Sequence, residues 1–156
     1  MAFLDAETGE VVLNQEITLQ GGMPYGDLGK HDKSRFPAGE QITFSVSDTP
    51  WGQASITLRF HQGALMSLNI WFSAVTSKSI LKNRNDELLI SCLGDPTGEK
   101  RIAKGFLDRW LLPIKQEPWL LEAKELRWEL PWGKVFSAVD PSDGDPVIWI
   151  HWVQAK

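Results

Sequence analysis

The chain has 156 residues, with 16 Lys and Arg against 20 Asp and Glu, and a formal net charge of −4. This length fits one domain spanning residues 1–156, and the acidic balance argues against the basic face of a nucleic-acid-binding protein. A lone cysteine, Cys92, excludes an internal disulfide, and no apolar run approaches the roughly 20 residues of a membrane-spanning helix. We therefore expect a cytoplasmic protein that binds neither nucleic acid nor membrane.

The N-terminal part of the chain predicts a hairpin followed by a long loop. Phe3 and Leu4 precede the turn-forming sequence DAETGE, and the strand-like run VVLNQEITL follows it. The next stretch, 21–40, contains several glycines and no regular apolar spacing. Long loops in compact domains are frequently functional, so we expect this one to contact a partner or to move.

The tripeptide Pro-Trp-Gly occurs twice, at 50–52 and 131–133, an offset of 81 residues (131 minus 50). At the same offset Trp71 aligns with Trp152. Alternating apolar and polar residues flank both copies, which is typical of half-buried strands. Proline cannot donate to a β-ladder and glycine permits a sharp bend, so we predict that each PWG is a corner between two strands. The pattern predicts two related β-units. The match at this offset is either the result of a duplication or a coincidence.

The last apolar run, VIWIHWV at 147–153, has hydrophobic side chains at both odd and even positions. Its even-numbered residues share one face, and Trp149 and His151 lie on the other. A strand that is apolar on both faces is typical of a central strand or of one covered by a partner. If the protein forms a homodimer, we expect this strand to make the contact.

One main helix is predicted, over residues 97–112, with Asp95 or Thr97 as its N-cap. Residues four apart form its apolar stripe, namely Ile102, Phe106 and Trp110. The run before it, Asp86–Leu93, predicts a strand, and Lys78–Arg84 predicts a solvated loop. The fold class is therefore predicted as α+β, an antiparallel sheet with this helix packed on it.

The sequence contains no recognisable set of catalytic residues. The three histidines, His31, His61 and His151, are not spaced as metal ligands, and we expect His151 to pack at the edge of the core. Cys92 lies in the apolar run ISCL, where a buried thiol is unreactive. Motifs for phosphate cradling or for a nucleophilic serine are missing. We therefore expect neither an enzyme nor a metal or other cofactor.

The segment DPSDGD at 140–145 is an acidic turn. A calcium-binding loop needs glycine at its sixth position and glutamate at its twelfth, whereas here glycine is fifth and His151 is twelfth. Its prolines, glycine and aspartates favour a hairpin turn instead. The cluster of carboxylates would attract a basic partner.

Four segments, FLDAETGEVVLN, FHQGALMSLNIWF, EKRIAKGFLDRWL and WELPWGKVFSAVDPSDGDPVIWIHW, resemble a family of small uncharacterised bacterial proteins. The shared features are a helix ending in Trp110-Leu111, the PWG at 131–133, and an Asp-containing turn before an apolar last strand. By analogy, acidic α+β proteins of this style resemble immunity proteins, which bind and block a cognate toxin. The resemblance implies an inhibitor of a basic protein toxin, with partner-binding residues Trp132, Asp140, Asp143 and Asp145.

The eight tryptophans support a second hypothesis. Indole N–H groups need hydrogen-bond partners, so we expect some of these side chains at the edge of the core. Aromatic residues there could line a cavity between the sheet and the helix, which would make the protein a small-molecule-binding domain.

Overall fold

The computed structural model describes residues 3–15, 17–24, 41–49, 52–72, 77–101, 123–140 and 144–153. Within these ranges the chain forms nine strands and one helix, which confirms the α+β class. The strands are β1 (Val11–Val12), β2 (Thr18–Leu19), β3 (Gln41–Thr49), β4 (Gly52–His61), β5 (Ala64–Phe72), β6 (Gly98–Arg101), β7 (Lys124–Leu130), β8 (Gly133–Val139) and β9 (Pro146–Trp152). The helix is α2 (Lys78–Leu93).

Seven of these strands form one antiparallel sheet in the order β3-β4-β5-β9-β8-β7-β6, while β1 and β2 pair with each other. Strand β9 lies at the centre, between β5 and β8, as its two apolar faces predict. Leu68 lies opposite Ile150, and Asn69 lies opposite Trp149. Because residues opposite each other point to the same side of a sheet, the even-numbered residues of β5 and β9 at these positions share one face.

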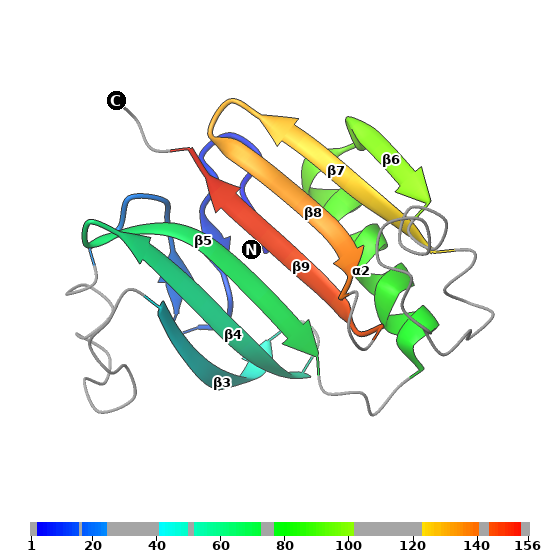
Figure 1. The fold of residues 1–156 in the computed structure, drawn as a ribbon, viewed down its shortest axis with the longest axis horizontal. Coiled ribbons are helices and arrows are strands. Elements are labelled where there is room, and N and C mark those ends of the chain that lie inside the picture. Colours follow the sequence, from blue (N-terminus) through cyan, green and yellow to red (C-terminus); the bar gives the residue numbers. More distant parts are fainter. Residues whose placement is uncertain are drawn as a thin grey trace, which may run out of the picture.

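One face of the sheet carries the hydrophobic core. Leu68, Ile70, Ile148 and Ile150 are fully buried there. Figure 1 shows α2 behind β7, β8 and β9, and the N-terminal strands behind the sheet beside it. Burial of this apolar surface is the main favourable contribution to folding. No described helix or strand covers the opposite face, which we call the open face.

The helix lies in a different place from the one that the sequence predicts. Residues 78–93 are helical, so the strand expected at 86–93 and the loop expected at 78–84 are both wrong. The expected helix at 97–112 is wrong at its start, because Gly98–Arg101 is strand β6, paired with β7. Residues 102–112 lie outside the described part of the chain.

A physical reason for this error is visible in the buried side of α2. It contains Lys82 and Asn85 beside Leu81 and Leu89, so two polar residues interrupt the apolar stripe. Sequence patterns assign such residues to solvent. The caps are ordinary: Ser77 Oγ accepts a hydrogen bond from the Ile80 N–H at 3.3 Å, and Gly94 with φ 82° ends the helix.

The hairpin predicted near the N-terminus is present only in part, because the run VVLNQEITL forms two short strands that pair with each other instead of one strand. Leu4 bridges to Val11, and β1 pairs with β2. Gln62 and Gly63, both at positive φ, connect β4 to β5. Cys92 is half-buried in α2 rather than in a strand, which corrects the environment expected for it.

The two β-units are present as the meanders β3–β4–β5 and β7–β8–β9. Each PWG connects its first two strands, because Leu130 pairs with Gly133 and Thr49 pairs with Gly52. The offset of 81 does not extend to the third strands. Trp71 is opposite Val147, on the open face, whereas Trp152 points into the core. The second hairpin has a longer loop and β5 has a pairing irregularity, so the register differs between the units.

Candidate functional site

The centre of the open face is aromatic. Trp149 in β9 lies opposite Phe136 in β8, and their rings stack with centroids 5.1 Å apart and an interplanar angle of 25°. His151 meets the Trp149 ring edge-on, with centroids 6.3 Å apart. We call Trp149, Phe136 and His151 the aromatic patch. Trp149 is 42% exposed although it lies on the central strand, so a large indole surface remains in contact with water.

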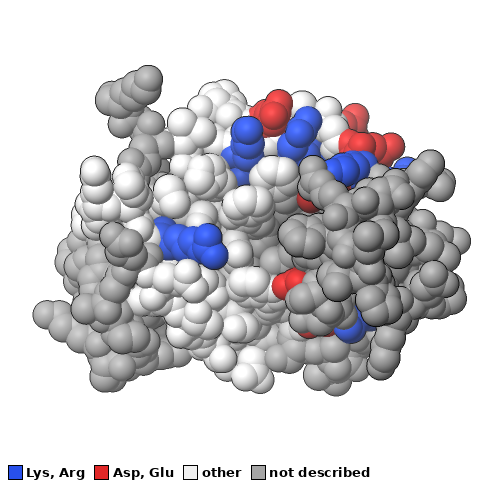
Figure 2. Space-filling view, viewed as in Figure 1, with Lys and Arg blue, Asp and Glu red and all other residues white. Residues whose placement is uncertain are grey.

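Basic side chains lie around this patch. Strand pairing places Lys134 opposite His151, and Arg127 opposite Phe136. Arg59 lies one strand beyond Ser67, which is itself opposite His151. Figure 2, in the view of Figure 1, shows basic side chains at the border of a largely uncharged central area. The open face therefore combines an apolar centre with a charged rim, in which Glu129 lies opposite Lys134 and near Arg127.

The cations of the rim differ in their pairing. Arg127 Nε lies 3.8 Å from Glu129 Oε1, and both side chains are about half exposed, so this pair contributes little. Arg59 and Lys134 are exposed and have no ion pair within the described ranges. Their charges are therefore available to a binding partner.

Asn69, opposite Trp149 on the open face, has an unsatisfied acceptor. Its Oδ1 atom is buried and has no hydrogen-bond partner. A buried polar atom without a partner costs about 1–3 kcal/mol, so such atoms are uncommon in folded proteins. The atom is covered in this conformation, so a ligand beside Trp149 could supply a donor only after the Asn69 side chain turns outward.

The site residues that the sequence predicts do not form one group. Trp132 lies in the turn before β8, whereas Asp140 follows the other end of β8, roughly 25 Å along an extended strand. Asp140 accepts a hydrogen bond from Trp71 Nε1 at 3.4 Å, and Asp145 is paired with Lys78 Nζ at 2.9 Å. Asp143 lies outside the described residues. The acidic turn is thus partly neutralised by the chain itself.

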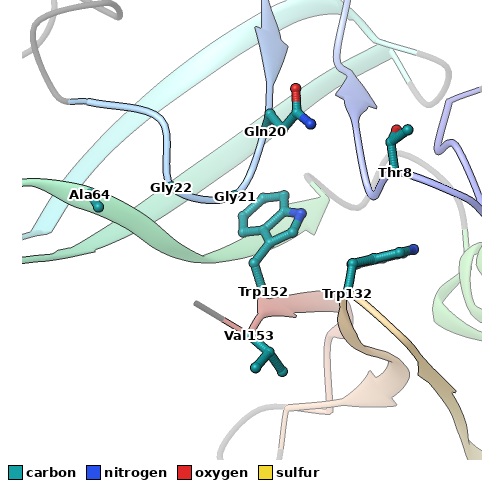
Figure 3. A pocket seen from close by; sticks show the side chains of 8 residues that line it. All are labelled: Thr8, Gln20, Gly21, Gly22, Ala64, Trp132, Trp152 and Val153. Atoms are coloured by element: carbon teal, nitrogen blue, oxygen red, sulfur yellow. The ribbon is translucent and has the colours of Figure 1, made fainter. Parts of the chain in front are cut away.

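Trp132 and Trp152 line a cavity of 330 Å³ at the end of the sheet, below Gly21 and Gly22 (Figure 3). Trp132 Nε1 donates to Ala6 O and Trp152 Nε1 donates to Gly9 O, each at 2.8 Å. These bonds hold the N-terminal turn against β9. Trp132, the tryptophan of the second PWG motif, therefore has a structural role whether or not the cavity binds a ligand.

A polar cluster is buried between α2 and β8. Lys82 Nζ lies 2.7 and 2.9 Å from the two Asp86 oxygens, and Ser137 Oγ donates to Asp86. Burial lowers the pKa of Lys82, while Asp86 and Glu125 oppose this shift. Neither polar side-chain atom of the fully buried Asn85, Oδ1 or Nδ2, has a hydrogen-bond partner. Ser137 is also fully buried, so a substrate cannot reach its hydroxyl in this conformation.

The other two histidines and the metal-binding types of side chain form no second candidate site within the described residues. His61 is exposed at the end of β4, and His31 lies outside the described residues. The described part of the chain contains no group of three or more His, Cys, Asp or Glu side chains that could hold a metal ion. Within the same part, no helix is long and apolar enough to span a membrane.

Sequence patterns point to only part of the aromatic patch. The alternation in 147–153 places Trp149 and His151 on one face. Phe136 and Lys134 join them only through the β8–β9 register, which depends on the hairpin loop. Asn69 and Arg59 come from a part of the chain about 80 residues earlier in the sequence, and only the central pairing of β5 with β9 brings them near.

Comparison with protein-family models, with curated proteins and with solved structures found no match. The resemblance to small bacterial proteins therefore stays a prediction.

Proposed function

We propose that the protein is a non-catalytic binding protein that docks a protein partner on the open face of its sheet. The observation that carries this proposal is Trp149, stacked on Phe136 in the middle of the face and 42% exposed. Tryptophan is enriched among the few residues that dominate binding energy, and those residues lie near the centre of an interface. An apolar centre with a charged rim also matches the usual anatomy of interfaces.

A narrower form of the proposal is that the partner is a protein toxin and that this chain is its immunity-type inhibitor. The resemblance to small bacterial proteins supports it. The contact surface proposed here is the aromatic patch in place of the acidic turn, because Asp140 and Asp145 already have partners within the chain. A neighbouring gene that encodes the captured partner would support the toxin identity.

Trp149→Ala tests the docking surface. We expect wild-type bait to retain a stoichiometric partner from cells of the source organism. The variant should bind that partner roughly thirtyfold more weakly and retain little or none, because a central tryptophan contributes about 2 kcal/mol or more. The matched control is Ile90→Ala, which removes an exposed apolar side chain from α2 on the other side of the sheet. Equal recovery by wild type and Trp149→Ala, with both folded by circular dichroism, would refute the proposal.

The cavity beside Trp132 and Trp152 favours a second candidate function, small-molecule binding. Two indole rings line it, so an occupant should change tryptophan fluorescence. In a screen of metabolites we expect, on this alternative, a saturable change that Ala64→Leu abolishes, because residue 64 lines the cavity and the added side chain would fill it. A response that Ala64→Leu leaves intact would place the ligand elsewhere.

A further inference from the structure

Two cations of the open face that have no ion pair within the described residues, Arg59 and Lys134, suggest the chemistry of what binds there. Arg59, Ser67, His151 and Lys134 lie in one row across four neighbouring strands. Neighbouring strands are about 4.8 Å apart, so the row from Arg59 to Lys134 spans roughly 14 Å. Trp149 lies two residues from this row and therefore roughly 7 Å away along β9.

We infer that the partner presents an acidic, extended segment to this row, with two carboxylates about four residues apart and an apolar side chain against Trp149. Four residues of extended chain cover roughly 14 Å, and residues four apart point to the same side, so two carboxylates at this spacing reach Arg59 and Lys134 together. This inference rests on the proposed function, since it describes the partner of the same surface.

Charge pairing supports an acidic occupant. Lys78, Lys82 and Lys124 each have a carboxylate partner within the chain, at 2.9, 2.7 and 3.5 Å. Within the described residues, Arg59 and Lys134 have none, and the same holds for Arg84 and Lys100. Glu129 lies opposite Lys134, but its ion pair is with Arg127. Unpaired charges of one sign around an apolar centre favour a partner of the opposite sign and speed its association.

Asn69 supplies an independent observation. Its unpartnered Oδ1 lies beside Trp149, on the strand that carries Ser67 and two residues from it. The atom is covered in this conformation, so a backbone N–H of an extended segment reaches it once the Asn69 side chain turns outward. The same face therefore offers an acceptor for the main chain, cations for carboxylates and an indole for an apolar side chain.

A polypeptide fits these features better than a single-stranded nucleic acid. One face of the Trp149 ring is already covered by Phe136, which leaves a smaller stacking platform for bases. The net charge of −4 also opposes a continuous phosphate backbone. A short acidic segment needs only the local pair of cations.

The test uses a phage-displayed library of random peptides, about 12 residues long, selected on the wild-type protein and counter-selected on Trp149→Ala. We expect the selected peptides to be enriched in Asp and Glu with an apolar residue between them. A labelled selected peptide should bind about tenfold more weakly to Arg59→Glu and to Lys134→Glu, and more weakly at about 300 mM than at about 50 mM salt. Arg84→Glu, an equal charge change on the exposed side of α2, is the control and should bind normally.

The outcomes separate this inference from the proposed function. Selected peptides that require Trp149 but carry no excess of acidic residues, or ignore both charge reversals, would overturn the acidic segment and leave the docking surface standing. A failure to select any Trp149-dependent peptide, together with an unchanged pull-down by Trp149→Ala, would remove both. Tighter, Trp149-dependent binding of a labelled oligouridylate of about 12 nucleotides would overturn the inference in favour of nucleic acid.

Discussion

Gly133→Ala is expected to destabilise the protein by about 3 kcal/mol, more than the same change at the equivalent glycine of the first PWG. A Cβ atom at Gly133 would overlap the carbonyl oxygen of His151 and lie 3.0 Å from the Cα of Trp152. Both atoms belong to the backbone of the central strand β9, so no side chain can rotate to relieve the contact. Relief requires β8 to move away from β9, and forced shifts of this kind cost about 1–3 kcal/mol or more.

Gly52→Ala is the matched control. A Cβ at Gly52 meets nothing within 4 Å, but its φ of 86° is left-handed. That conformation costs an alanine roughly 1–2 kcal/mol. Urea unfolding followed by tryptophan fluorescence measures both variants. A Gly133→Ala variant that loses no more stability than Gly52→Ala would show that β8 and β9 are less closely packed at this end than the structure indicates.

Local patterns predict the sheet well because its strands obey simple rules. The two-sided apolar run at 147–153 predicts a central strand, and β9 is central. Proline and glycine in the PWG motifs predict corners, and residues 131–132 form a two-residue turn between β7 and β8. These features depend on neighbouring residues only, so one sequence is sufficient to find them.

The helix and the site depend on contacts that local patterns do not contain. Lys82 faces the core in α2 with Asp86 as its partner, and Ser137, 51 residues further along the chain, donates to the same carboxylate. The polar atoms of Asn85 are buried there without a hydrogen-bond partner, which no pattern in the sequence indicates. The aromatic patch requires the register of β8 against β9, and Asn69 joins it only through the register of β5 against β9. A bulge in a strand reverses which of its later residues face the core. Because β5 contains such an irregularity, Trp71 lies on the open face, whereas Trp152, at the equivalent position of the second unit, points into the core.

Asp86→Asn is expected to cost about 3 kcal/mol at neutral pH. The substitution keeps the shape of the side chain and an acceptor for Ser137, but leaves the Lys82 ammonium buried without its carboxylate. Removing one partner of a buried ion pair costs roughly 3–5 kcal/mol. We expect the lower end of this range because the Asp86 side chain is 22% exposed.

The pH dependence of this variant has a definite sign. Burial already lowers the pKa of Lys82 below its ordinary value of 10.5, and Asp86 is the stronger of the two carboxylates that oppose this. Without Asp86, the folded-state pKa falls further, with only Glu125 opposing the effect of burial. Between that pKa and the unfolded value the unfolded chain binds more protons, so stability rises with pH there. The penalty in Asp86→Asn should therefore shrink as the solution becomes more alkaline.

Urea unfolding of wild type and Asp86→Asn from neutral to alkaline pH measures this difference, and groups common to both proteins cancel in the comparison. The double variant Lys82→Met/Asp86→Asn should recover most of the lost stability at neutral pH, because no unpaired charge is then buried. Its stability relative to wild type should also lack the upward trend with pH shown by Asp86→Asn. A single variant as stable as wild type at neutral pH would mean that Lys82 reaches water in solution and that the α2–β8 contact is looser than this packing implies.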